Sequence, residues 1–330
     1  MKTVFVINPV SGKGKKSKRL VSELRQRAAE GEDLQIYFTK GSLDAKKFVR
    51  KYMMAWPKEQ LRIYVCGGDG TVNEAVNGYM QAKEALERAG QIPEAALGVI
   101  PIGSGNDFIR NLTDQQTAMD LSAQLAAEPT ACDAIEIRGR IDGKETVRYC
   151  DNMINIGFDC NTVDSTNQLR VYPFISGSFA YLMGILVTLI QKKGANLKIT
   201  AKGEMLHRGP LLLSSQANGA FCGGGVNSNP TANVLDGLMN INIIKDIDRL
   251  TFLRLLPLYM QGTHMQFPHV DQIIRTAVCE EAEIEPLDGQ MRICIDGEIV
   301  SAEKIHLKTI KGAFNFLVPR ELFGATSEKP

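Results

Sequence analysis

Residues 61–74 of the chain read LRIYVCGGDGTVNE, and this segment contains the pattern from which the fold can be predicted. Leu61–Cys66 is a short apolar run that predicts a buried β-strand, and the glycines that follow predict a sharp turn. From Val72 onward, apolar residues recur at helical spacing through Met80, which predicts an amphipathic helix. A strand, a glycine turn and a helix in this order make one βα unit of a parallel sheet.

The same pattern recurs on both sides of this segment. Strands are predicted at 3–7, 34–39 and 97–102, and glycine-containing loops follow the first and the last of them. Residues 1–128 are therefore expected to form an open, twisted α/β sheet. Because such sheets bind ligands beyond the carboxyl ends of their strands, we expect the chemistry in the loops that follow these strands.

Past residue 128 the pattern changes to β-type runs separated by turns such as Asp142-Gly143 and Asp296-Gly297. Residues 129–318 are expected to form a second, β-rich domain. Residues 319–330 are expected to return to the first domain and end in a frayed tail. The length of 330 residues agrees with about two domains, at roughly 150 residues each.

Composition excludes several classes of protein. Lys and Arg number 38 against 37 for Asp and Glu, so the net charge of +1 is too small for a protein that binds duplex nucleic acid over a broad face. Seven scattered cysteines without a Cys-x-x-Cys pair argue against a disulfide framework and a zinc cluster. The longest apolar run, 179–190, is shorter than the about 20 residues that cross a bilayer, and no signal-peptide pattern opens the chain. The expected location is cytoplasmic.

The first loop, 8–17, reads NPVSGKGKKS and leads into a helix. Backbone amides freed by glycine, together with lysine charge at a helix amino terminus, predict an anion site. The spacing differs from that of a P-loop, and a solvated basic turn is the alternative interpretation.

The second loop surrounds Asp69 with three glycines. A carboxylate repels a bare phosphate, but it can hold a magnesium ion that bridges phosphates, or take a proton. Glu74 stands three residues after Thr71, the spacing of a capping box, which favours a helix cap over a catalytic role. A tight structural turn is the alternative for the whole loop.

The third loop, 103–108, reads GSGNDF. Ser104 can donate to a phosphate, and Asn106 or Asp107 can cap the following helix. Three such loops at strand ends of one sheet predict a single phosphate-rich ligand, most economically a nucleotide. In the second half, the acids of Asp236-Gly237 and Asp296-Gly297-Glu298 stand out, although each can be read as a turn residue.

Together these motifs resemble the diacylglycerol kinase catalytic domain and its bacterial soluble lipid kinase relatives. The second-half motifs at 218–225, 236–237 and 296–298 look like the family's in order, so the resemblance spans nearly the whole chain. NAD kinases have a similar Gly-Gly-Asp-Gly-Thr, but their Asn-Glu/Asp pair lies well downstream, whereas Asn73-Glu74 follows the loop directly. The implied fold is the two-domain NAD kinase/diacylglycerol kinase-like fold, an open α/β nucleotide domain followed by a β-sandwich-like domain.

The resemblance implies an ATP-dependent kinase that phosphorylates the hydroxyl of a membrane lipid, with diacylglycerol as the leading acceptor and phosphatidic acid as the product. Alternatives are a kinase of phosphatidylglycerol or of a sphingoid base, an NAD kinase-like phosphotransferase, and a catalytically silent nucleotide-binding regulator. The implied ATP-binding residues are Asn8, Pro9, Ser11, Gly12, Lys13, Thr39, Gly67, Gly68, Asp69, Gly70, Thr71, Val72, Asn73, Ser104 and Asn106.

The resemblance also implies roles for the acids. Glu298 is the expected general base, while Asp69, with Asp107 and Asp133 behind it, is expected to orient the catalytic Mg²⁺ and its waters. A structural Mg²⁺ maps to Asn233, Asp236 and Leu238, but Leu235 stands where many relatives carry Asp or Asn. Glu298→Gln and Asp69→Ala are each expected to abolish activity and to leave thermal unfolding nearly unchanged.

A lipid substrate implies transient, peripheral contact with the inner face of the membrane. The expected contact residues are the cationic cluster Lys13, Lys15, Lys16, Lys18 and Arg19, and the stretch 170–190 with Arg170, Tyr172, Phe174 and Phe179. An ordinary core helix and a solvated basic face are the alternatives. No nucleic-acid partner is expected, and a homodimer is left open.

Overall fold

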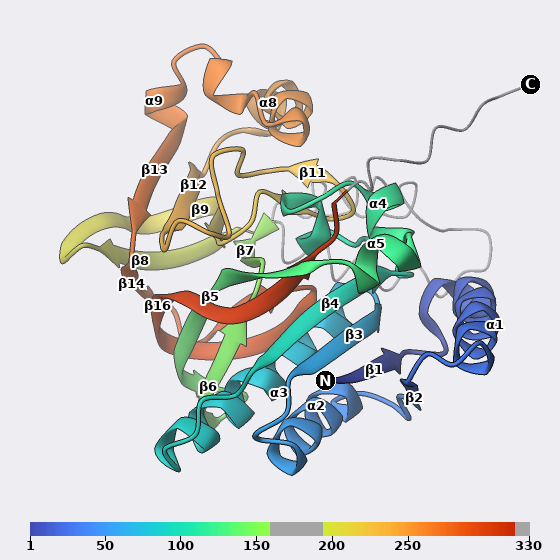
Figure 1. The fold of residues 1–330 in the computed structure, drawn as a ribbon. Coiled ribbons are helices and arrows are strands. Elements are labelled where there is room, and N and C mark those ends of the chain that lie inside the picture. The colour runs from blue at the N-terminus through green and yellow to red at the C-terminus, as the bar shows by residue number, and fades with distance from the viewer. Residues whose placement is uncertain (159–193, 321–330) are drawn as a thin grey trace, which may run out of the picture. The chain divides into compact units, whose positions relative to one another are not determined.

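A computed structural model describes residues 1–158 and 194–320 of the chain (Figure 1). The chain divides into two compact units, Met1–Ala131 with Phe314–Pro330, and Cys132–Ala313. These boundaries differ from 128 and 318 because strands β5 (Glu128–Ile141) and β16 (Glu298–Val318) run through them without a break. The expected membrane-contact stretch 170–190 lies outside the described residues.

The first unit contains a parallel sheet in the order β2-β1-β3-β4. The strands are β1 (Lys2–Ile7), β2 (Leu34–Phe38), β3 (Leu61–Gly67) and β4 (Ala95–Pro101). The four strands predicted from the sequence are thus confirmed. The end of β16 adds a further parallel neighbour, with Phe316 opposite Leu97 of β4.

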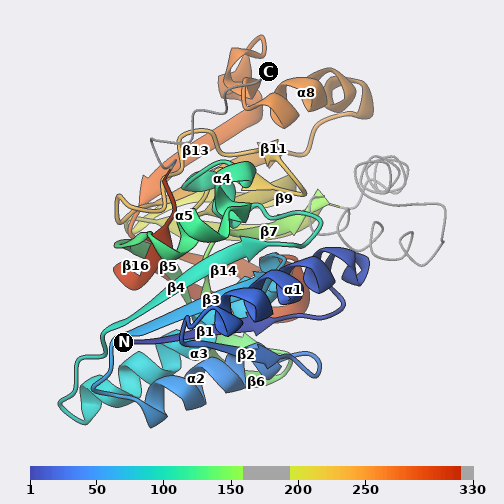
Figure 2. The same cartoon turned by 45° about the vertical axis from the view of Figure 1, so that its right-hand side comes forward.

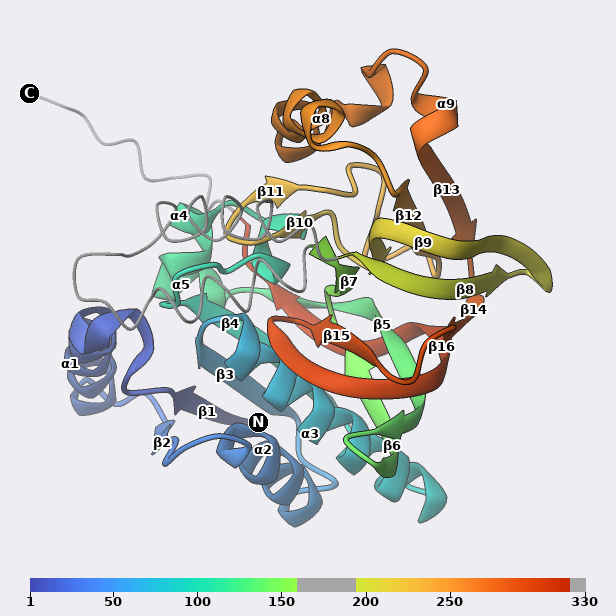
Figure 3. The ribbon, with the colours of Figure 1, turned by 180° about the vertical axis from the view of Figure 1, so that it is seen from behind.

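Helices cover the sheet of the first unit. The main ones are α1 (Lys15–Ala29), α2 (Asp44–Ala55) and α3 (Asp69–Arg88), and short ones are η1 (Ser11–Gly14), η2 (Phe108–Asn111), α4 (Gln115–Met119) and α5 (Leu121–Leu125). Leu20 and Leu24 of α1 pack on Phe5 and Tyr64, on one face of the sheet (Figure 2). Helices α2 and α3 lie side by side on the other face (Figure 3).

The second unit is mostly antiparallel β-structure. Its other strands are β6 (Lys144–Cys150), β7 (Met153–Gly157), β8 (Ala195–Ala201), β9 (Glu204–Ala217), β10 (Phe221–Cys222), β11 (Val226–Asn227), β12 (Met239–Lys245), β13 (Ile274–Cys279), β14 (Glu281–Pro286) and β15 (Met291–Ile295). Strand pairing runs β7-β9-β8-β14-β16-β15 and back to β7, a closed circuit. An aliphatic core including Ile156, Ile199, Ile284 and Ile293 belongs to these strands.

The described residues of the second unit also form three helical segments: α8 (Arg249–Gln261), η3 (His264–Gln266) and α9 (Val270–Ile273). Phe252 and Leu255 of α8 pack with Leu213 and Ile244 in a second apolar cluster. Within the described part of the chain, no helix combines the length and the apolar character needed to cross a membrane.

Candidate functional site

The strands of the first unit end together at one edge of the sheet. Ile7 of β1 lies opposite Cys66 of β3, and Gly67 lies opposite Pro101 of β4. Backbone hydrogen bonds continue beyond these ends: Asn8 N donates to Cys66 O at 2.9 Å, and Gly103 N donates to Gly67 O at 3.1 Å. The three glycine loops and Thr39, whose N–H donates to Ile7 O at 2.9 Å, therefore begin at the same edge.

The three loops contact one another through their glycines. A Cβ atom on Gly103 would lie 2.3 Å from the Cα of Gly68, and one on Gly12 would lie 2.4 Å from the carbonyl oxygen of Ile102. Gly12 also has a φ of +58°, which glycine adopts without strain. The glycines are required for this close approach, and the convergence expected from the sequence is present in the structure.

The Asp69 carboxylate joins the second loop to the third. Its Oδ1 accepts hydrogen bonds from the N–H groups of Asp107 (2.6 Å) and Phe108 (3.2 Å), and its Oδ2 accepts one from Asn106 (2.7 Å). Asn106 has a φ of 56°, and this left-handed turn precedes the other two donors. The carboxylate at the start of α3 thus holds the backbone of the neighbouring loop in place.

Other polar side chains fix the loops in the same way. Asn8 donates from Nδ2 to Thr71 Oγ1 at 3.1 Å, which links the first loop to the second. Asn106 donates from Nδ2 to the carbonyl of Gly103 at 3.1 Å, while its buried Oδ1 has no hydrogen-bond partner. Ser104 is exposed, so its hydroxyl is accessible to a ligand.

The other residues predicted to bind the nucleotide differ in how far they are exposed to solvent. Pro9 and Gly70 are exposed, Ser11 and Gly12 are half-buried, and Thr39, Gly67, Val72 and Asn73 are buried. Val72 packs in the core, so that only its backbone could meet a ligand. Lys13 belongs to η1, and its side chain lies outside what the structure describes.

Glu74 has a different role from the one predicted. Its Oε1 accepts a hydrogen bond from Leu43 N at 2.8 Å, and its Oε2 accepts one from Ala45 N at 3.2 Å. Glu74 therefore caps the start of α2, a neighbouring helix, and the predicted capping box of its own helix is wrong. The partner residues lie about thirty positions away, so local sequence contained no signal for this contact.

The structure shows which backbone groups the acids Asp69 and Asp133 contact, and the expected role of Asp69, Asp107 and Asp133 toward a catalytic Mg²⁺ stays a prediction. Asp133 belongs to the second unit, where its Oδ2 accepts from Gly237 N at 2.6 Å and its Oδ1 from Gly312 N at 2.8 Å. Burial raises the pKa of Asp133. Among the described residues no three His, Cys, Asp or Glu side chains are arranged to hold a metal ion. The carboxylates of Asp69 and Asp133 both accept backbone N–H bonds.

The predicted structural magnesium site is a hydrogen-bonded turn. Asn233 Oδ1 accepts from Leu235 N at 3.1 Å, and Asp236 Oδ1 accepts from Leu238 N at 2.8 Å. The exposed Leu235 supplies no oxygen where an acid would strengthen a cation site. The resemblance assigns this site one carboxylate together with main-chain carbonyls, and a Mg²⁺ at these residues stays a prediction.

In the second unit, the turn between β15 and β16 is anchored by Asp296. Its buried carboxylate accepts hydrogen bonds from the N–H groups of Asp151 (2.9 Å), Asn152 (3.2 Å) and Met153 (2.8 Å), and from Cys150 Sγ (3.2 Å). The sequence indicated only a hairpin turn at this position. The structure adds a long-range anchor to the turn between β6 and β7.

Glu298, the predicted base, follows this anchored turn as the first residue of β16. Its side chain is 57% exposed, and its Oε2 lies 2.6 Å from Arg148 Nη2 on β6. The carboxylate is thus accessible and is held in one direction by an arginine.

Two family models match the chain. The diacylglycerol kinase catalytic domain matches residues 2–137, and the YegS C-terminal NAD kinase beta sandwich-like domain matches residues 152–318. A probable lipid kinase YegS-like protein of Pectobacterium atrosepticum is 26% identical over 320 residues, which cover 96% of each chain. A diacylglycerol kinase of Bacillus subtilis is 26% identical over 90% of this chain and 92% of its own.

Solved structures share the fold. A putative diacylglycerol kinase from Bacillus anthracis superposes with a TM-score of 0.70 at 23% identity, over 97% of each chain. Yeast NADH kinase complexed with NADH reaches a TM-score of 0.52 at 11% identity, over 100% of this chain and 89% of its own. The chain therefore belongs to the YegS and diacylglycerol kinase-like family of lipid kinases. Its fold is the predicted one, an α/β domain followed by a β-sandwich-like domain.

Proposed function

We propose that this protein transfers the γ-phosphate of Mg-ATP to the hydroxyl of a membrane lipid, and that the lipid is diacylglycerol, so that the product is phosphatidic acid. The observation that carries the proposal is the contact of three glycine loops at one sheet edge, with the Asp69 carboxylate joining two of them. The match to a diacylglycerol kinase of Bacillus subtilis supports the choice of acceptor.

In this proposal the loops bind the triphosphate through backbone N–H groups. Glycines allow a phosphate to approach the chain closely, and the amino terminus of the long helix α3, which starts at Asp69, favours negative charge. Ser104 adds a hydroxyl donor, and Lys13 adds positive charge. Mg²⁺ enters with ATP as part of the substrate and neutralises charge on the phosphates.

In this proposal the Asp69 carboxylate holds the third loop in place and does not itself react. It holds the N–H groups of residues 106–108, and a ligand-binding loop must keep its geometry to align phosphate and acceptor. We therefore assign Asp69 as a positioning residue for the phosphate loops.

The transfer step needs a base. Glu298 takes the proton of the lipid hydroxyl, the resulting oxygen forms a bond to the γ-phosphorus, and the bond from that phosphorus to the bridging oxygen breaks to release ADP. Such a base contributes about 10²–10⁴-fold to the rate. The 57% exposure of Glu298 leaves its carboxylate accessible to a substrate, and Arg148 restricts its orientation.

The enzyme would act peripherally at the inner face of the membrane.

The test is a parallel acceptor assay with γ-labelled ATP and Mg²⁺. Diacylglycerol, phosphatidylglycerol, undecaprenol, sphingosine and NAD are offered separately, each lipid dispersed in detergent. Label in diacylglycerol above all others supports the proposal. Label in another lipid alcohol retains the kinase reaction and changes the acceptor.

An NAD kinase-like reaction is the second candidate, because the yeast NADH kinase shares the fold. Asn73-Glu74 directly after the glycine loop disfavours it, and in the structure Glu74 is engaged with the backbone of α2. Label in NAD alone would establish this candidate and exclude the lipid reaction.

A further inference from the structure

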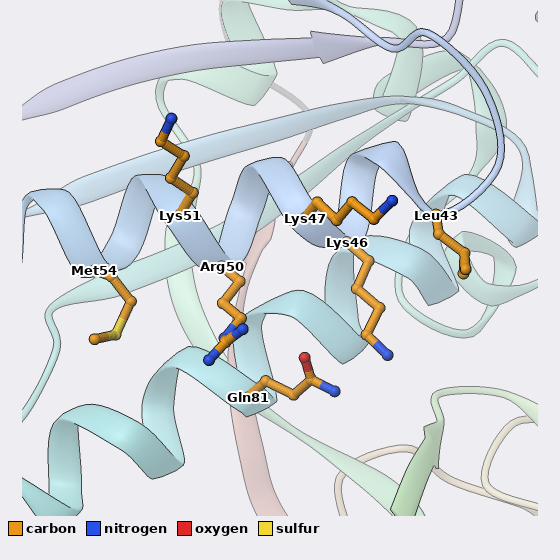
Figure 4. A pocket seen from close by; sticks show the side chains of 7 residues that line it. All are labelled: Leu43, Lys46, Lys47, Arg50, Lys51, Met54 and Gln81. Carbon is orange, nitrogen blue, oxygen red and sulfur yellow. The ribbon is translucent and has the colours of Figure 1, made fainter.

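The outer face of α2 carries a cationic groove. Its lining comprises one residue of α3, Gln81, and a row along α2 and the residue before it: Leu43, Lys46, Lys47, Arg50, Lys51 and Met54 (Figure 4). The groove has a volume of about 430 Å³. We call these seven residues the α2 groove. None of them belongs to the phosphate loops or to the hairpin of Glu298.

The packing of α2 on α3 explains why these side chains face outward. A Cβ atom on Gly78 of α3 would lie 2.3 Å from the carbonyl oxygen of Lys46, so the two helices touch through their backbones. The opposite face of α2, with Val49 and Met53 among its residues, is fully buried. The cations are therefore confined to the exposed side, and Figure 4 shows Arg50 projecting toward Gln81 of α3.

Three cations of the α2 groove lie exposed on its outer side, Lys47, Arg50 and Lys51. Lys47, Arg50 and Lys51 form no ion pair with any described residue. At the start of α2, the carboxylate of Asp44 accepts from Tyr37 Oη (2.9 Å) and Lys40 N (2.8 Å), and Glu74 caps the helix, so neither forms an ion pair with these three cations. The groove therefore presents several cations to an external partner.

Large apolar side chains lie at both ends of this cationic row. Leu43 is 47% exposed at one end, and Met54 and Trp56 are 42% and 40% exposed at the other. Lys2 Nζ lies 3.9 Å from the centre of the Trp56 ring, which adds a further cation beside the aromatic side chain. Cations between exposed apolar and aromatic side chains match the interfacial region of a bilayer, where anionic headgroups meet acyl chains.

We propose that the α2 groove docks the protein onto a bilayer containing anionic phospholipids. The inference rests on the proposed function, since a lipid acceptor has to be reached at a membrane. Lys47, Arg50 and Lys51 would bind headgroup phosphates, and Leu43, Met54 and Trp56 would enter the interface. A bilayer matches the α2 groove better than one small anion, because the cations extend over six residues, or about 8 Å of helix at roughly 1.5 Å per residue.

The experiment measures binding to vesicles by sedimentation, without ATP or acceptor. The full chain is mixed with vesicles of phosphatidylcholine alone and of phosphatidylcholine with phosphatidylglycerol. The test variant replaces Lys47, Arg50 and Lys51 together with Gln. The matched control replaces Lys144, Lys202 and Arg208 with Gln, three cations of the second unit that lie outside the α2 groove.

We expect the wild type to bind only the anionic vesicles and to dissociate as salt is raised. The test variant should lose tenfold or more in vesicle affinity, since each lysine or arginine near an anionic surface adds about 1 kcal/mol. The control variant should lose less than about twofold. With acceptor dispersed in detergent, both variants should retain the wild-type kinase rate, which separates docking from the proposed reaction.

Three results would overturn the inference. Equal losses of vesicle affinity in the test and control variants would mean that binding depends on the net charge of the protein and not on the α2 groove. Displacement from vesicles by millimolar inorganic phosphate at constant ionic strength would indicate a site for a small anion. Loss of binding on replacing Lys15, Lys16 and Lys18 but not the α2 cations would place the contact at the start of α1. If the detergent assay shows no lipid kinase activity while vesicle binding depends on the α2 groove, the proposed function fails and the docking surface stands.

Discussion

Asp69 in the first unit and Asp296 in the second are each followed by glycine, and each accepts backbone N–H bonds from a loop distant in the sequence. They differ in setting. Asp69 is half-buried at the start of helix α3, among the glycine loops, whereas Asp296 is only 8% exposed at a hairpin turn and its carboxylate accepts from four donors. The comparison teaches that an acid in such a motif can position a loop, while an exposed neighbour such as Glu298 remains available for chemistry.

The largest expected effect is on the kinase rate and comes from Glu298, two residues after Asp296. Glu298→Gln should lower phosphoryl transfer by about 10²–10⁴-fold, because an amide cannot accept the hydroxyl proton. Thermal unfolding should change little, since the side chain is 57% exposed. The measurements are initial rate and melting temperature. Glu303→Gln, on the same strand and paired with Arg140 at 3.7 Å, is the control and should leave the rate unchanged. A variant of Glu298 with most of the wild-type rate would remove its assignment as base.

Asp296→Ala should have the next largest effect, now on stability. Four donors lose their acceptor in a buried place, and we expect the free energy of unfolding to fall by about 3 kcal/mol. Denaturant unfolding measures the change. Asp142→Ala is the control: Asp142 has the same φ of 47° before a glycine, but its exposed carboxylate accepts one hydrogen bond from the described residues, from Ser301 N at 2.9 Å. Equal losses in the two variants would show that turn conformation, and not the anchor, provides the stability.

Asp69→Asn should lower both the stability of the protein and its kinase rate. An amide offers one oxygen to three N–H donors, so we expect about 2 kcal/mol less stability and a lower kinase rate from displaced loops. This replaces the expectation, drawn from the sequence, that unfolding would be nearly unaffected. Asp120→Asn, which keeps an acceptor for the cap of α5, is the control for the first unit. An unchanged unfolding curve for the Asp69 variant would contradict the anchoring role.

The smallest effect concerns Asp133 and pH. Burial raises the pKa of this carboxyl above its ordinary 3.8, so the folded state binds the proton more tightly than the unfolded state. Its contribution to stability is therefore greatest below about 3.8 and is lost as pH rises through the raised pKa. Unfolding free energies of the wild type and Asp133→Asn, measured at about pH 7 and about pH 4, should show the wild type gaining on the variant upon acidification. The opposite sign would mean that the N–H bonds from Gly237 and Gly312 outweigh burial.

Much of the candidate site followed from local sequence. A strand of six or seven residues, a glycine turn and a helix can be recognised within one window, so the positions of the loops at 8–17, 67–74 and 103–108 at strand ends could be predicted from sequence pattern alone. Contacts between residues that are far apart in the sequence could not be predicted in this way. The anchoring of residues 106–108 by Asp69, and of 151–153 by Asp296, joins positions far apart in the chain.

The α2 groove illustrates the same division. Lys46, Lys47, Arg50 and Lys51 are visible in the sequence as a charged stretch, but their arrangement beside Gln81 depends on how α3 packs against α2 at Gly78. Glu74 gives a second case, since the helix it caps is not its own.

The amino-acid sequence by itself therefore determined the βα units, the β-rich second half and the family, because periodicity and glycine turns act over a few residues. The tertiary structure alone decided which carboxylates serve the backbone and which remain accessible. Asp69, Asp133 and Asp296 accept backbone N–H bonds from distant segments, whereas the exposed Glu298 pairs with the side chain of Arg148. The physical reason is that a buried carboxylate must be satisfied by whatever donors folding brings to it, and those donors are chosen by long-range packing.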